Sequence, residues 1–102
     1  MAKVVIEYQV PEHCKVDLKG LPLANKNTIS LNVQSPCDKI NFMIELAKFS
    51  QAISFTDCET ASDIWAQVVE SLACSDETLA TFSDVRKGVL ITINFTGVKY
   101  NV

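Results

Sequence analysis

The chain has 102 residues, of which 48% are hydrophobic and 21% are charged, and its formal net charge is −3. This composition excludes a disordered chain, because there are ample apolar residues to bury, and no apolar run approaches the roughly 18 residues of a membrane span. The first ten residues, MAKVVIEYQV, lack the long apolar segment of a signal peptide. We therefore expect one cytoplasmic domain over residues 1–102.

The first third of the chain alternates apolar and polar residues, a pattern typical of strands with one buried face. In KVVIEYQV, residues 3–10, the side chains of Val4, Ile6 and Tyr8 share a face, and Pro11 ends the strand. Three further segments are predicted before the first helix: a short strand over 15–19, a loop over 23–27 and a strand over 28–34.

The period then changes to that of a helix. Ser35-Pro36-Cys37-Asp38 is typical of a helix start, with Ser35 as the N-cap and Pro36 at the first helical position, and the helix is expected to end near Ala52. It has two apolar faces, one formed by Ile40, Met43, Ile44 and Ala47, the other by Phe42, Leu46, Phe49 and Ile53. A helix this apolar is expected to be covered on two sides, by the sheet and by a second helix.

A second helix is predicted to begin after Thr60, with Asp63 in the capping position three residues later. It has one polar side, which holds Asp63, Gln67 and Glu70. The other side is an apolar stripe, which is expected to face the core: Ile64, Trp65, Val68, Val69 and Leu72.

Ser75 resembles another N-cap, and it predicts a short third helix through Leu79 and Phe82 that Gly88 ends. VLITINF, residues 89–95, is the last strong strand, and the alternation continues to the end of the chain after a bulge or turn at Gly97.

The order β-β-β-α-α-α-β(-β) predicts an α+β fold. We expect a two-layer sandwich, in which a mainly antiparallel sheet of four or five strands has two or three helices on one face. The first and last strands are the most hydrophobic, so they are expected near the centre of the sheet.

The residues capable of nucleophilic or metal chemistry are few and scattered. His13 is the one histidine, and the four cysteines Cys14, Cys37, Cys58 and Cys74 form no C-x-x-C pair. In a reducing compartment such cysteines are expected to be free thiols, and no metal site or cofactor is predicted. One enzymatic hypothesis stays open: Cys37, near a helix start that lowers a thiol pKa, would be the nucleophile and His13 the base.

The charges are strongly segregated along the chain. Residues 49–85 contain seven carboxylates and no lysine or arginine, a charge of −7, while the remaining residues hold five acids and nine bases, a charge of +4. A surface selected only for solubility mixes both signs. Acids at helix starts explain part of this pattern, and a merely solvated surface is one interpretation of the rest.

The other interpretation is functional, and it is the one we favour. We expect a small non-enzymatic protein-interaction module, of the inhibitor or regulator type made by viruses and bacteria, that binds a basic surface of another protein. Direct nucleic-acid binding is not expected, because phosphates would be repelled. A third hypothesis is a self-assembling subunit, a homo-oligomer whose sheet edges pair. The predicted partner-binding residues, called the acidic face below, are Asp63, Glu70, Asp76 and Glu77.

Overall fold

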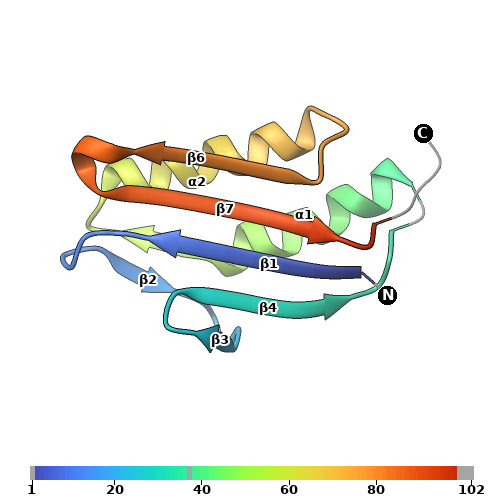
Figure 1. Ribbon diagram of the computed structural model, residues 1–102, viewed down its shortest axis with the longest axis horizontal. Helices are drawn as coiled ribbons and strands as arrows, with labels where there is room; N and C mark the ends of the chain where they lie inside the picture. Colours follow the sequence, from blue (N-terminus) through green and yellow to red (C-terminus); the bar gives the residue numbers. More distant parts are fainter. Residues whose placement is uncertain (1, 37, 99–102) are drawn as a thin grey trace.

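The computed structural model describes residues 2–36 and 38–98 of the chain. Four strands precede the first helix, a short strand separates the two helices, and two further strands follow the second helix (Figure 1). Their bounds are β1 Ala2–Gln9, β2 Lys15–Asp17, β3 Leu23–Asn25, β4 Thr28–Val33, α1 Lys39–Ala52, β5 Ser54–Thr56, α2 Glu59–Ala73, β6 Leu79–Asp84, the 3₁₀ helix η1 Val85–Lys87, and β7 Val89–Thr96.

The fold is α+β, as predicted. A five-stranded antiparallel sheet in the order β3-β4-β1-β7-β6 lies in front of α1 and α2 in Figure 1, and both helices cover the same face. The expectation that the first and last strands are central is confirmed, because β1 and β7 pair with each other and each has a neighbour on its other side. The short strands β2 and β5 form a second, two-stranded sheet.

The core lies between the sheet and the two helices, and aromatic rings hold its layers together. The ring of Phe95 on β7 lies 4.8 Å from that of Phe42 and 6.3 Å from that of Phe49, both on α1. Trp65 of α2 packs against Phe55, and its indole N–H donates to the carbonyl oxygen of Ser50 at 3.4 Å. The predicted apolar stripe of α2 is confirmed, since four of its members are buried and the fifth is partly buried.

The helix starts differ from the predictions. Asp38, not Ser35, is the N-cap of α1, and its carboxylate accepts the backbone N–H of Asn41 at 2.8 Å. Ser35, Pro36 and Asp38 all favour a helix start, and the chain uses the last of them. The second helix begins at Glu59, so Asp63 is its fifth residue and lies beyond the capping position.

The expectation that α1 is covered on two sides is wrong. Ile40, Met43 and Ile44 are 73%, 43% and 50% exposed, and Ala47 is exposed as well. The two helices lie beside each other on the sheet (Figure 1), so α2 does not cover the outer side of α1.

The predicted third helix is also wrong, because its residues form strand β6. Side chains of this strand alternate, with Ala80 buried, Phe82 partly buried, and Leu79, Thr81 and Ser83 exposed. The strand is antiparallel to β7, with Phe82 opposite Ile91. Leu79 and Phe82 are three residues apart, a spacing that places both on one face of a helix but on opposite faces of a strand, and here the pairing with β7 makes the segment a strand.

Two further segments differ from the expected pattern. Residues 23–25 of the predicted loop form the short strand β3, which pairs with β4. The unpredicted strand β5 separates α1 from α2. The predicted continuation of the last strand through residues 99–102 lies outside the described residues. No helix in the described part of the chain is both long and apolar enough to cross a membrane.

Candidate protein-interaction site

The structure places all four residues of the acidic face in contact with solvent. Asp63 and Glu70 lie on the exposed side of α2, and Asp76 and Glu77 lie in the connection between α2 and β6. Within residues 2–36 and 38–98, no ion pair includes any of these four carboxylates. They therefore form a negative surface along one side of α2 and past its C-terminal end, with no ion-pair partner among the described residues.

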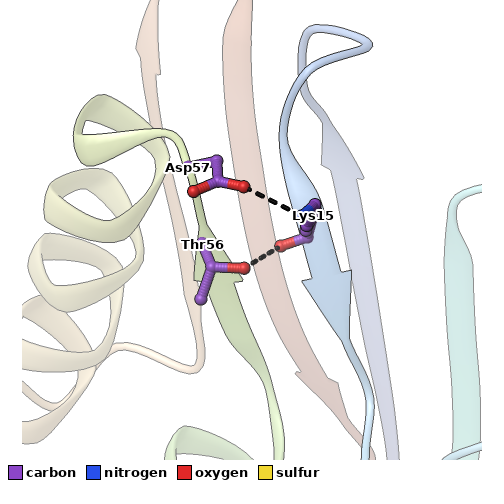
Figure 2. A network of polar contacts seen from close by, with 3 residues as sticks. All are labelled: Lys15, Thr56 and Asp57. Carbon is purple, nitrogen blue, oxygen red and sulfur yellow. Dashed lines mark hydrogen bonds and ion pairs between the residues drawn. The ribbon is translucent and has the colours of Figure 1, made fainter.

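The other three acids of residues 49–85 each have a local structural role. The carboxylate of Asp57 lies 3.2 Å from the ammonium of Lys15, and next to it the hydroxyl of Thr56 donates to the carbonyl oxygen of Lys15 (Figure 2). Glu59 lies in the first turn of α2, where the helix dipole favours a negative charge. Asp84 caps η1 by accepting the backbone N–H of Lys87 at 3.2 Å.

Local structure does not explain the acidic face in the same way. Asp76 and Glu77 were expected in the first turn of a third helix, but that segment is a connection followed by a strand. Glu70 lies in the last turn of α2, where the helix dipole disfavours an anion. The positive charge that stabilises this end comes from α1: the ammonium of Lys39 donates to the carbonyl oxygens of Leu72, at 2.8 Å, and of Ser75.

A shallow, open groove adjoins Glu70 of the acidic face. It has a volume of about 310 Å³, and its lining comes from both α2 and β6: Gln67, Glu70, Ser71, Cys74 and Phe82. Its α2 side and Asp63 belong to one stripe of the helix, because residues 63, 67, 70 and 74 recur at three- and four-residue spacing. The groove is thus lined by one carboxylate of the acidic face, that of Glu70, and by Phe82 of the outermost strand of the sheet.

The thiol hypothesis is not supported by the described residues. Cys37 lies outside them. His13 is exposed and follows the C-terminal end of β1. Pro36 and Asp38 lie near the opposite end of that strand, because they follow Val33, which pairs with Ala2. An eight-residue strand is about 25 Å long, so His13 is far from both of these residues. Cys14, the sequence neighbour of His13, is a free, partly buried thiol.

Burial raises the pKa of the Cys14 thiol to about 11, and the neighbouring Cys58 thiol, with which it hydrogen bonds, and Asp57 act in the same direction. At pH 8 Cys14 would then be ionised in only about one molecule in a thousand, and the thiolate is the reactive form. We predict that iodoacetamide modifies the exposed Cys74 well before Cys14, whose labelling rises only towards pH 11. Peptide mapping by mass spectrometry at a series of pH values measures this, and rapid labelling of Cys14 at pH 8 would contradict it.

No cluster of three or more histidine, cysteine or carboxylate side chains suited to a metal ion occurs in the described part of the chain. Comparison with protein-family models, with curated proteins and with solved structures found no match. The acidic face and its groove form the candidate site because the four carboxylates are exposed and have no ion-pair partner among the described residues.

Proposed function

We propose that this protein is a small, non-enzymatic cytoplasmic interaction module that binds a basic surface of another protein through its acidic face. The observation that supports this most strongly is the difference between the two sets of acids in residues 49–85. Three of them are used by the fold, while Asp63, Glu70, Asp76 and Glu77 are exposed and have no ion-pair partner in the described residues. Glu70 even occupies a position where its charge opposes the helix dipole.

Such a surface would act mainly on the rate and selectivity of association. Clustered charge of one sign attracts an oppositely charged partner over a distance and repels partners of the same sign. The free thiols of Cys14, Cys58 and Cys74 fit a reducing compartment. A role as an inhibitor or regulator of the bound partner, of the viral or bacterial type, follows from the proposal because the chain would cover the partner's basic surface.

The proposal predicts that reversing two charges of the acidic face prevents capture of the partner. Immobilised wild-type protein and the Asp63→Lys, Glu70→Lys variant are exposed to the same cell lysate, and bound proteins are compared by quantitative mass spectrometry. We expect at least one basic protein to be depleted about tenfold or more on the variant, because like charges then face each other.

The matched control is Glu7→Lys, Glu12→Lys, which changes the net charge equally at exposed positions outside the acidic face. This control should retain the captured protein, and both variants should unfold at wild-type denaturant concentrations. Equal capture by the wild type and the Asp63→Lys, Glu70→Lys variant would refute the proposal and favour the interpretation of a merely solvated surface.

Self-assembly is the second candidate function, and one observation favours it. Strand β6 is an outer strand of the sheet and could pair with another copy, as the third hypothesis requires. Light scattering over a concentration series distinguishes this candidate, because the measured mass would rise from that of one chain to that of two or more.

A further inference from the structure

The two edges of the sheet differ in how well they are protected. At one edge β3 has only three residues, follows Pro22, and pairs with β4 through a shifted register. Short strands, prolines and register shifts are the means by which proteins prevent pairing at sheet edges. At the other edge β6 has six residues in continuous register with β7, and it contains no proline or lysine.

The register shows which backbone groups of β6 face outward. The N–H of Phe95 donates to the carbonyl oxygen of Thr78 at 2.8 Å, so Thr78, Ala80 and Phe82 belong to the residues whose backbone groups bond to β7. The alternate residues Leu79, Thr81 and Ser83 direct their N–H and C=O groups away from the sheet. No hydrogen bond from these outward groups to another described residue is present.

The surroundings of this edge indicate which strand would fit there. The groove lies between Phe82 of β6 and α2 and is bordered by Glu70, with Asp63 on the same stripe of the helix. Asp76 and Glu77 precede β6, so negative side chains lie at one end and along one flank of the edge. The positive residues of the β6–β7 connection, Arg86 and Lys87, lie beyond the opposite end of the strand.

A second copy of this chain matches the charges of this edge only in part. If two β6 strands paired antiparallel about a two-fold axis near Thr81, Arg86 and Lys87 of each copy would lie near Asp76 and Glu77 of the other. Asp63 and Glu70 on the two α2 helices, however, would face the same carboxylates of the other copy. Like charges brought together in this way destabilise a complex. A basic segment of a different protein would instead be attracted to the carboxylates of Asp63 and Glu70 beside this edge.

We infer that β6 accepts an extended, lysine- or arginine-rich peptide segment as a sixth strand of the sheet, with basic side chains directed towards Asp63 and Glu70. The backbone groups of Leu79, Thr81 and Ser83 supply the hydrogen bonds, and the groove lined by Phe82 receives the side chains on the helix side. This inference rests on the proposed function and adds the conformation of the bound segment and its place on the fold.

The test uses a defined probe, a fluorescein-labelled heptapeptide of alternating lysine and valine, and fluorescence anisotropy. The variant Thr81→Pro removes one outward N–H without removing a hydrogen bond to β7. Thr81→Val is its matched control, because it keeps the N–H and loses the same side-chain contact with the Thr92 hydroxyl, 3.0 Å away. We expect Thr81→Pro to weaken binding about tenfold or more and Thr81→Val to bind as the wild type does.

A second measurement leaves the protein unchanged, in case Thr81→Pro does not fold. The same peptide methylated at every backbone nitrogen cannot donate to β6, so we expect it not to bind. Binding of the methylated peptide, or wild-type affinity in a folded Thr81→Pro variant, would overturn strand addition. If Asp63→Lys, Glu70→Lys still abolished binding in that case, the acidic face would remain the binding surface without a paired strand. Failure of the unmodified peptide to bind the wild type, or dimerisation of the protein through β6, would also overturn the inference.

Discussion

Replacing Phe95 by alanine is expected to lower the free energy of unfolding by about 3–5 kcal/mol, the usual cost of removing a buried phenylalanine side chain. Phe95 is 2% exposed, and it lies on β7, an interior strand of the sheet. Its ring contacts Phe42 and Phe49, so it joins α1 to the sheet. The loss would therefore combine a cavity with a weakened contact between two layers of the fold.

Leu90→Ala is the control for this substitution, because Leu90 lies on the same strand but faces the uncovered side of the sheet and is 37% exposed. We expect it to cost less than about 1.5 kcal/mol, since much less apolar surface is removed from the interior. Urea unfolding followed by Trp65 fluorescence measures both variants. Similar losses for the two would show that the sheet has no preferentially covered face.

Replacing Lys39 by methionine is expected to cost about 2 kcal/mol. Its ammonium donates to two carbonyl oxygens at the C-terminal end of α2, those of Leu72 and Ser75, and lies 4.8 Å from the centre of the Phe42 ring. Hydrogen bonds made by a charged group contribute more than neutral ones, and here they also balance the negative end of the helix dipole. Methionine keeps most of the apolar stem and removes only the charge and its donors.

Lys48→Met is the matched variant on the same helix. Lys48 forms an exposed ion pair with Glu45, three residues earlier, at 3.0 Å, and such pairs contribute about 0–1 kcal/mol. Urea unfolding should therefore place Lys39→Met well below Lys48→Met in stability. If the two variants were equally stable, Lys39 would not be holding α2 in place. The position of Glu70, two residues before Leu72 and five before Ser75, would then depend on other contacts.

The parts of the fold predicted from the sequence are those with a strong local pattern. Strands β1 and β7 alternate over eight residues each, and α2 has an unbroken apolar stripe, so their type and buried face could be inferred directly. Strand β6 could not, because Leu79 and Phe82 also match a helical spacing and only the pairing with β7 distinguishes the two. Lys39 was missed because its acceptors lie 33 and 36 residues away in the sequence.

The candidate site was predicted in part for the same reason. The exposure of Asp63 and Glu70 follows from the helical period of α2, and the structure agrees. The groove and the unprotected edge beside them depend on the strand order, which the sequence does not reveal. The segment predicted as a third helix is a connection followed by strand β6, so Asp76 and Glu77 do not lie at a helix start. The fold therefore accounts for fewer charges of the acidic face than the sequence analysis predicted.

The most direct test of whether the four carboxylates serve a partner is the salt dependence of capture from lysate. Attraction between an acidic surface and a basic partner is screened beyond about 8 Å at physiological ionic strength and over shorter distances at higher salt. Wild-type protein should therefore capture its partner strongly at low salt and lose it as salt is raised, while the Asp63→Lys, Glu70→Lys variant captures little at any salt concentration. Capture by the wild type that is equally strong at low and high salt would contradict binding through the acidic face.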